Sequence, residues 1–459
     1  MENKQKSLLF EQMPIPKAVF TLAVPTILSS LVMVLYNLAD TWFVGMLNDP
    51  IQNAAVTLAS PVLLAFNAVN NLFGVGTSSM MGRALGRKEE ETVRRSSAFG
   101  FWASAFSGLL FSLLFTAFRT PLLSVLGASA ENSAATAGYL FWTVTFGAAP
   151  SILNVVLAYL VRTEGASMHA SIGTMSGCLL NIVLDPIFIL PWGLNMGAAG
   201  AGLATFISNC FACLYFFVLL FIKRKSTYVC LHPKMAAPKR AIVFGICAVG
   251  IPASIQNLLN VTGMTVMNNF ASAFGSDAVA AIGIAYKINM IPMQVAMGFS
   301  QGIMPLISYN YGSRNISRAK KAFTFAAKLT LSGLVLISVL FYVFAGNLMN
   351  LFIQTETIIA YGTKFLRGMC LGIPFLAMDF LCVGALQACG KGLISFVFAL
   401  MRKVILEIPA LIILNMLFPL YGLAYAQFAA EFILAFIAIT TLMHLFRKIQ
   451  REEHLQKVS

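Results

Sequence analysis

Long apolar stretches recur along the whole chain, and this feature restricts the possible folds more than any other. They extend from Lys17 to Phe446 in a chain of 459 residues, of which 58% are hydrophobic and 10% charged. Soluble domains contain about 25% charged residues, whereas a helix that crosses a membrane needs about 20 predominantly apolar residues. The pattern excludes a large water-soluble domain and predicts an all-α polytopic membrane protein.

Hydropathy predicts twelve transmembrane helices of roughly 20 to 28 residues each. Their expected ranges are 18–45, 54–80, 97–118, 138–161, 168–191, 199–222, 241–268, 279–305, 322–345, 360–388, 393–417 and 422–446. The longest polar interruption lies at the middle of the chain and indicates a cytoplasmic linker over 223–240. We therefore expect an N-lobe of six helices over 1–222 and a C-lobe of six helices over 241–459.

The distribution of basic residues predicts the orientation in the membrane. The net charge is +14, from 31 Lys and Arg against 17 Asp and Glu. Such a charge on a soluble protein would suggest a nucleic-acid partner, but cytoplasmic loops of membrane proteins collect basic residues. If the N-terminus is cytoplasmic, 27 of the 31 basic residues fall in cytoplasmic segments, with Arg402 and Lys403 counted in a cytoplasmic loop. Both termini are predicted to be cytoplasmic, and no nucleic-acid partner is expected.

The two halves of the chain match each other residue by residue. Pro25 in AVPTILSS aligns with Pro252 in GIPASIQN, and Gly165 in AAPSILNVVLAYLVRTEG aligns with Gly390 in GIPFLAMDFLCVGALQACG. With six helices in each half, both halves enter the membrane in the same direction, so they are parallel repeats. Transporters built from repeats bind substrate near the membrane midplane between the halves and rock one half against the other.

Ionisable residues inside the apolar helices are the strongest functional candidates, because an acid at a helix centre costs about 2.5–3.5 kcal/mol on insertion scales. The deepest are Asp40, Asp185, Asp379 and Glu431, with Lys287 and Glu407 less deep. Glu431, Glu407 and Lys287 can also neutralise one another across helices, so their role stays open at the level of sequence.

Asp185 has the most informative surroundings, in the segment NIVLDP. Asn181 precedes it by one helical turn and shares its face, and Pro186 leaves a backbone carbonyl without its usual donor. These oxygens suit a small hard cation such as Na⁺, and they equally suit a carboxyl that is protonated because it is desolvated. The alternative is an acid held neutral by hydrogen bonds between helices for structure alone.

Asp40 and Asp379 are the other two acids for which the sequence supplies a context. Tyr36 lies one turn before Asp40, and Pro25 breaks the same helix and offers a hinge, as does its repeat counterpart Pro252. Asp379 occupies the repeat position of Asn154, so one half carries an acid where the other carries an amide. Asp379 is therefore the expected counter-charge for a cationic substrate, with a headgroup-facing Asp40 and a structural Asp379 as alternatives.

Motifs of energy coupling and catalysis are missing from the sequence. It contains no GxxxxGK[ST] phosphate-binding loop, no HExxH and no GxSxG. We therefore expect neither an enzyme nor a cofactor, and transport must draw on an ion gradient.

Several stretches resemble one transporter family over nearly the whole chain. They are AVPTILSSLVMVLYNLADTWFVG, NNLFGVGTSSMMGRALG, LVRTEGASMHASIGTMSGCLLNIVLDPIFI, MGAAGAGLATFISN, MGFSQGIMPLISYNYG and GALQACGKG. The chain resembles the multidrug and toxic compound extrusion (MATE) family, and within it a branch of bacterial multidrug exporters. The resemblance implies two six-helix lobes and export of organic cations in exchange for Na⁺ or H⁺.

The resemblance also implies which residues form the sites. The family's N-lobe cation site matches Asp40, Asn181, Asp185 and Thr205, of which the first three are the implied ligands if the ion is Na⁺. Tyr36 and Asn154 match residues that line the same lobe. In the C-lobe Asp379 matches, but the seventh helix offers only the amides Gln256, Asn257 and Asn260. This departs from the family's two-acid pattern in that lobe, so coupling is expected in the N-lobe.

The sequence thus predicts a cation-coupled antiporter that exports lipophilic, often cationic drugs by alternating access. The expected substrate contacts are Tyr36, Asn154, Gln256, Asn257, Lys287 and Asp379. We expect a monomer in the lipid bilayer of a bacterial inner membrane. The alternative is a flippase for lipid-linked oligosaccharides, which would need several arginines for a pyrophosphate, whereas only Lys287 is expected to lie deep. A membrane-embedded enzyme and a passive channel are weaker alternatives.

Overall fold

The computed structural model describes residues 8–237 and 239–458. Throughout these residues the regular structure is helical, as expected of a polytopic membrane protein whose spans must satisfy their own backbone hydrogen bonds. Residues 1–7, 238 and 459, which belong to the predicted N-lobe, linker and C-lobe, lie outside the described residues.

The helices follow the predicted order along the chain. The first half contains α2 (Ile15–Gly45), α3 (Pro50–Leu58), α4 (Ser60–Asn70), η1 (Asn71–Val75), α5 (Gly76–Gly86), α6 (Glu90–Ala117), α7 (Arg119–Val125), α8 (Ser133–Leu140), η2 (Phe141–Phe146), α9 (Ala148–Thr163), α10 (Ser167–Ile189) and α11 (Ala198–Ile222). After η3 (Pro233–Ala236), the second half contains α12 (Arg240–Ser272), α13 (Ser276–Gly312), α14 (Ile316–Val343), α15 (Ala345–Asn350), α16 (Glu356–Ala388), α17 (Gly392–Leu400), η4 (Met401–Glu407), α18 (Ile408–Leu417) and α19 (Gly422–Val458).

Within the described residues, ten helical segments are long and apolar enough to cross a membrane, or eleven if a bent pair counts as one span. The bent pair joins Ser133–Phe146 to Ala148–Thr163 at an angle of 52° and occupies the predicted range 138–161. The predicted span 393–417 is not among the candidates. It falls on α17, η4 and α18 and carries Arg402, Lys403 and Glu407 near its middle.

Contacts divide the chain into two compact units, and the boundaries between them fall inside two long helices, α2 and α12. The first unit holds Leu28–Ser254 together with the segment that ends at Gln12, and the second holds Met13–Ile27 and Ile255–Ser459. Helix α2 thus changes unit two residues after Pro25, and α12 does so two residues after Pro252. The lobe boundaries inferred from hydropathy remain a prediction.

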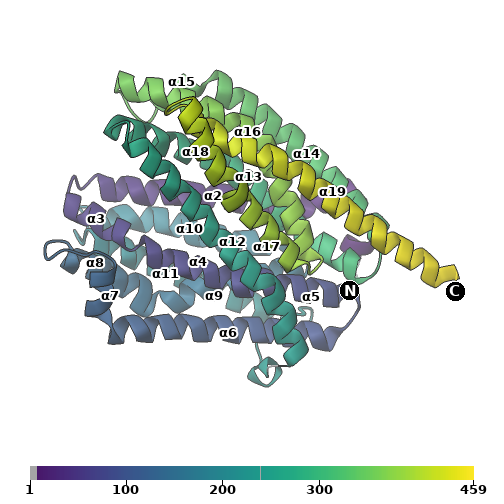
Figure 1. Cartoon of the computed structure of the whole chain (residues 1–459). Coiled ribbons are helices and arrows are strands. Elements are labelled where there is room, and N and C mark those ends of the chain that lie inside the picture. The colour runs from purple at the N-terminus through teal and green to yellow at the C-terminus, as the bar shows by residue number, and fades with distance from the viewer. Residues whose placement is uncertain (1–7, 238, 459) are drawn as a thin grey trace. The chain divides into compact units, whose positions relative to one another are not determined.

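In the first unit, α10 and α11 pack against each other and against α9, which also contacts α6 (Figure 1). The predicted linker is fastened to this bundle by specific hydrogen bonds. Trp102 Nε1 of α6 donates to the carbonyl of Leu231 at 3.0 Å, and the buried carboxylate of Glu164 accepts from the backbone N–H of Tyr228 at 2.9 Å. The linker is therefore part of the first unit rather than a free tether.

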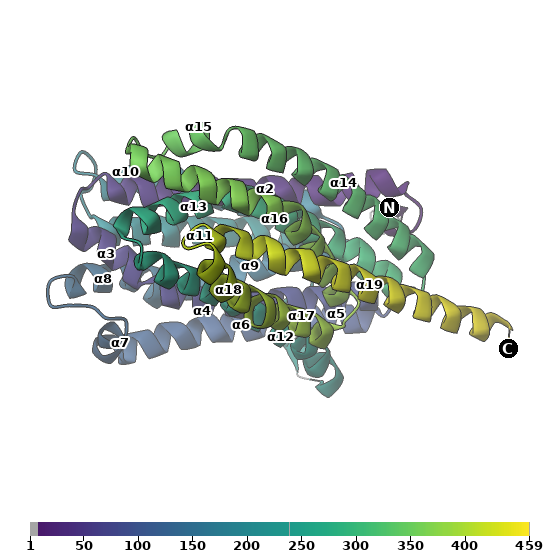
Figure 2. The same ribbon diagram turned by 45° about the horizontal axis from the view of Figure 1, so that its top comes forward.

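In the second unit, α16 is the central helix. Helices α13, α14 and α19 pack along it (Figure 2), and 83% of its most apolar window is buried, against 28–39% in the other candidate spans. Leu, Ile, Ala and Met side chains from these helices form a continuous core around it. This central position explains why an acid on α16 lies away from solvent.

Left-handed backbone positions recur at the same places in both halves. The matching pairs, 225 to 227 residues apart, are Asn48 with Gly275, Lys88 with Arg314, Gly165 with Gly390, and Asn195 with Leu420. Positive φ is uncommon outside glycine. Four matching pairs are therefore unexpected unless the connections between helices have the same backbone conformation in both halves. The backbone therefore agrees with the internal repeat inferred from the residue match.

Close glycine contacts hold the first part of α2 in the second unit. A Cβ atom at Gly302 of α13 would lie 2.6 Å from the Cα of Ala23, and one at Gly298 would lie 2.8 Å from the Cα of Ile27. Because only glycine permits this approach, α2 and α13 can touch backbone to backbone.

Replacing Gly302 with Leu is expected to destabilise the second unit by about 1–3 kcal/mol, because the added side chain forces α2 away from α13. The temperature at which half of the detergent-solubilised protein loses its monodisperse peak measures this. Gly333→Leu is the matched control, since a Cβ at Gly333 meets nothing within 4 Å. An equal loss of stability in both variants would contradict the packing argument.

Candidate functional site

The first unit contains a polar cluster formed by side chains of α2, α10 and α11, and its α10 members are buried. Asp185 is fully buried and Asn181 is 2% exposed, both on α10. One orientation of the Asn181 side-chain amide forms hydrogen bonds with both neighbouring groups. In it the amide nitrogen donates to Asp185 Oδ2 at 2.9 Å and the amide oxygen accepts from Thr205 N at 3.1 Å. Asn181 and Asp185, one turn apart on α10, are thus joined by a hydrogen bond on the face that the sequence predicts they share. Helix α11 supplies the third residue, Thr205.

Asp40 and two tyrosines complete this cluster. Asp40 on α2 is close enough to Asp185 for their charges to interact, and its Oδ1 is buried without a hydrogen-bond partner among the described residues. Tyr36 lies within hydrogen-bonding range of Thr205 and interacts electrostatically with both acids. Tyr139 on α8 interacts with the same two acids, and sequence reasoning missed it because nothing near it in the chain is charged.

Asn154 lies on α9 and is buried. Its Nδ2 donates to Asn209 Oδ1 of α11 at 2.8 Å and also lies 3.2 Å from the carbonyls of Pro150 and Ser151. The amide therefore joins α9 to α11. Its predicted contact with substrate stays a prediction.

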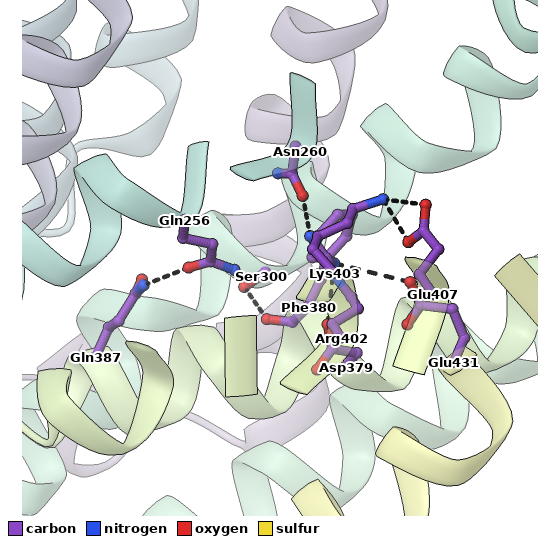
Figure 3. A network of polar contacts seen from close by, with 10 residues as sticks. All are labelled: Gln256, Asn260, Ser300, Asp379, Phe380, Gln387, Arg402, Lys403, Glu407 and Glu431. Atoms are coloured by element: carbon purple, nitrogen blue, oxygen red, sulfur yellow. Dashed lines mark hydrogen bonds and ion pairs between the residues drawn. The ribbon is translucent and has the colours of Figure 1, made fainter. Parts of the chain in front are cut away.

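The second unit contains a cluster of charged side chains around Arg402 (Figure 3). Arg402 Nη1 lies 3.0 Å from Asp379 Oδ2 and 3.8 Å from Glu431 Oε1, and all three side chains are at most 2% exposed. Arg402 Nη2 donates to Asn260 Oδ1 of α12. Lys403 Nζ donates to both carboxylate oxygens of Glu407, at 2.7 and 2.5 Å.

Two expectations from the sequence change at this point. The assignment of Arg402 to a cytoplasmic loop is wrong, because its side chain is buried against α16 and α19. Asp379 is consequently not a free counter-charge, since the guanidinium of Arg402 already neutralises it. Glu407 is neutralised by Lys403 and not by Lys287, which is exposed on α13.

The π-helix η4 explains why Arg402 was misplaced. In a π-helix each backbone hydrogen bond joins residues that are five apart rather than four. The side chains that follow therefore point in a different direction from the one that a regular α-helix would give them. Arg402 and Glu407, five residues apart in η4, are both buried. The signal available in the sequence was the position of Arg402 ten residues inside an apolar stretch that begins at Gly392.

The remaining predicted residues lie on α12. Gln256 Oε1 accepts from Gln387 Nε2 of α16 at 3.2 Å (Figure 3), and Asn257 is half-buried beside it. Pro252 lies within α12 and Pro25 within α2, and both helices continue through their prolines. The structure thus pairs Gln256 with another amide, and the substrate and hinge roles stay predictions.

The two clusters differ in what they can hold. The first offers two carboxylates, an amide and a hydroxyl, which are oxygen ligands suited to a proton or a small hard cation. Within the described residues no group of three His, Cys, Asp or Glu side chains could hold a metal ion. If Asp40 and Asp185 bind Na⁺, neutral oxygen atoms must therefore complete its coordination shell. The second cluster carries its own cations.

Comparison with known proteins gives consistent similarities over the whole chain. The profile of the MatE family matches residues 25–187 and again 252–413. The multidrug export protein MepA of Staphylococcus aureus (strain MRSA252) is 33% identical over 442 residues, which cover 95% of each chain. A crystal structure of MATE in the straight conformation superposes with a TM-score of 0.91 at 26% identity, covering 98% of this chain and 99% of that one. A structure described as the outward-facing conformation of a multidrug resistance MATE family transporter of the MOP superfamily gives 0.89 at 26% identity, covering 97% and 98%.

Proposed function

Because the chain belongs to the MATE family of membrane transporters, we propose that it exports lipophilic, often cationic drugs in exchange for H⁺ or Na⁺. The relatives that are named multidrug export proteins support the substrate class. The proposal includes twelve spans, with the bent pair α8–α9 and the interrupted segment α17–α18 each counted as one, and both termini in the cytoplasm.

One observation carries the coupling mechanism, namely the cluster of Asp40, Asn181, Asp185 and Thr205, in which Asn181 and Asp185 are buried and Asp40 and Thr205 are half-buried. Two acids that are close enough to repel each other favour the binding of a single positive charge. When an external H⁺ or Na⁺ enters, this repulsion disappears and the helices that carry the acids can approach. We infer that α2 then bends near Pro25, where its backbone lacks a hydrogen bond, and that substrate is expelled from the first unit.

The prolines coincide with the places where α2 and α12 change unit. A helix whose two parts pack in different units must absorb any displacement of one unit at that point. This supports Pro25 and Pro252 as hinges in alternating access.

Transport driven by separately imposed gradients tests this function. Proteoliposomes that contain the purified protein should move a fluorescent lipophilic cation against its concentration gradient when either a Na⁺ or a H⁺ gradient is applied. Each charge that moves through 100 mV supplies about 2.3 kcal/mol, so transport should stop when the driving gradient is collapsed by an ionophore. Flux that continues unchanged after collapse would indicate a channel and would contradict antiport.

The flippase alternative gains no support from the second unit. A pyrophosphate needs free positive charges, and the buried guanidinium of Arg402 is already paired with Asp379. Transport of lipid-linked precursors by the same proteoliposomes, without transport of lipophilic cations, would nevertheless favour it.

A further inference from the structure

Helix α16 is the most buried span of the second unit, yet its N-terminal part reaches the surface along one narrow strip. Four exposed residues at intervals of three or four positions form this α16 strip, namely Ala360, Lys364, Arg367 and Leu371. This spacing places them on one face of the helix. The positions between them are buried or half-buried. The α16 strip therefore presents two neighbouring cations and then an apolar side chain.

A tyrosine from a neighbouring segment holds each cation. Lys364 Nζ lies 4.4 Å from the ring centroid of Tyr421 and donates to the hydroxyl of this residue at 3.3 Å. The guanidinium carbon of Arg367 lies 5.4 Å from the ring centroid of Tyr342, whose backbone carbonyl accepts from Arg367 Nε at 3.2 Å. An aromatic face attracts a cation without neutralising it. These contacts therefore fix the two charges in position and leave them uncompensated.

No described carboxylate balances these charges. Neither Lys364 nor Arg367 forms an ion pair with a described residue, and the terminal guanidinium nitrogens of Arg367 donate to no described acceptor. Like charges one helical turn apart destabilise a helix, so an anion placed between them would be stabilising. Arginine and lysine side chains are the usual partners of phosphate groups. The upper part of the α16 strip thus suits a phosphate.

The two cations lie at the level of lipid headgroups. Tyr342 is the last residue but one of α14, and Tyr421 directly precedes α19. The ends of apolar helices lie where hydrocarbon meets headgroups, and tyrosine is enriched at this level. The proposed orientation makes this end of the second unit the outer one, where basic residues are rare. Two adjacent cations at this place are therefore a specific feature and not part of the general cytoplasmic excess.

Beyond the cations the surface becomes apolar. Leu371, one turn after Arg367, is 40% exposed, and Phe432 of α19 is 42% exposed. Phe432 also packs against Phe375, one further turn along α16, with the ring centroids 5.1 Å apart. Leucine and phenylalanine side chains on a lipid-facing surface suit an acyl chain. The same strip thus offers a place for both parts of a phospholipid.

We propose that the α16 strip binds one anionic phospholipid such as phosphatidylglycerol, with its phosphate between Lys364 and Arg367 and an acyl chain along Leu371 and Phe432. A single exposed cation attracts anionic lipid weakly and without a fixed place. Two cations held above an apolar strip select such a lipid at one position. The inference concerns the lipid-facing surface of one unit and does not depend on the proposed export function.

Quenching of a tryptophan placed on the α16 strip tests the proposal in vesicles without any gradient. The native tryptophans all belong to the first unit, namely Trp42, Trp102, Trp142 and Trp192. Leu371→Trp therefore reports on the strip, and the fluorescence of the protein without this substitution is subtracted. Phosphatidylglycerol with brominated acyl chains should quench this tryptophan with a binding constant at least about tenfold above that of brominated phosphatidylcholine, as two cationic contacts predict.

The double variant Lys364→Gln/Arg367→Gln, made together with Leu371→Trp, should lose this preference. The matched control is Arg447→Gln/Lys448→Gln with Leu371→Trp, which removes one exposed arginine and one exposed lysine from α19 of the same unit and should keep the preference. Equal quenching of all three proteins by brominated phosphatidylcholine alone shows that the tryptophan still faces lipid in each of them.

Three results would overturn the inference. The first is a Leu371→Trp protein without preference for phosphatidylglycerol, and the second is a preference that survives Lys364→Gln/Arg367→Gln or disappears equally in the control. The third comes from inorganic phosphate added in excess, which should leave the preference unchanged. If it removes the preference, the two cations bind a free anion and not a lipid.

Discussion

Replacing Asp185 with Asn is expected to abolish gradient-driven export while the protein remains folded in the membrane. The amide has the same shape and can keep its hydrogen bond with Asn181, but it cannot take up H⁺ and it offers Na⁺ no charge. One charge moving through 100 mV supplies about 2.3 kcal/mol, which sustains an accumulation ratio of about fifty-fold. We expect this ratio to fall to one in Asp185→Asn proteoliposomes.

Asp49→Asn is the matched control for this experiment. Asp49 belongs to the same unit and caps α3, with its Oδ1 accepting from Ile51 N at 2.9 Å, and Asn caps helices equally well. Asp49→Asn should therefore transport as the wild type does. If Asp185→Asn accumulates substrate to the wild-type ratio, the assignment of coupling to the first unit is wrong.

Replacing Arg402 with Met is expected to have the largest effect on stability. It removes the positive charge that lies 3.0 Å from Asp379 Oδ2 and 3.8 Å from Glu431 Oε1. Breaking a buried ion pair by removing one partner costs about 3–5 kcal/mol, because an uncompensated charge stays buried. Thermal unfolding of the detergent-solubilised protein should show a large decrease in stability, or the variant should fail to accumulate in the membrane.

The double variant Arg402→Met/Asp379→Asn identifies the cause of this effect. It removes one charge of each sign, and much of the lost stability should return. Arg447→Met on the exposed part of α19 is the control for loss of an arginine and should lie within about 0.5 kcal/mol of the wild type. If Arg402→Met is no less stable than Arg447→Met, the buried ion pair does not stabilise the second unit.

The helical membrane fold and part of the first cluster could be predicted because their signals are local. Apolar stretches of sufficient length become helices in lipid whatever they pack against, so most of the predicted spans fall on candidate spans. Asn181 and Asp185 lie on one helical turn, and the structure joins them by a hydrogen bond. Asp40 and Thr205 lie on other helices, and the family resemblance rather than spacing brought them into the same expected site.

The second cluster could not be predicted in the same way. Asp379, Arg402 and Glu431 come from α16, η4 and α19, and no regular spacing in the sequence relates them. Arg402 was assigned to a loop because basic residues near an apolar boundary follow the orientation rule. The π-helix that turns Arg402 toward Asp379 has no strong sequence signature, so its charge could not be matched with its partners.

The sequence by itself determined that this protein is a helical membrane protein with an internal repeat, because these properties depend on local hydropathy and on residue identity at a fixed offset. Only the tertiary structure decided which acids face one another and which cations neutralise them. The energy of a buried charge depends on atoms within a few ångströms of it, and in a helical bundle those atoms belong to helices that are distant in the sequence. That is why Asp379, expected from the sequence as a counter-charge for substrate, lies in the structure as the partner of Arg402.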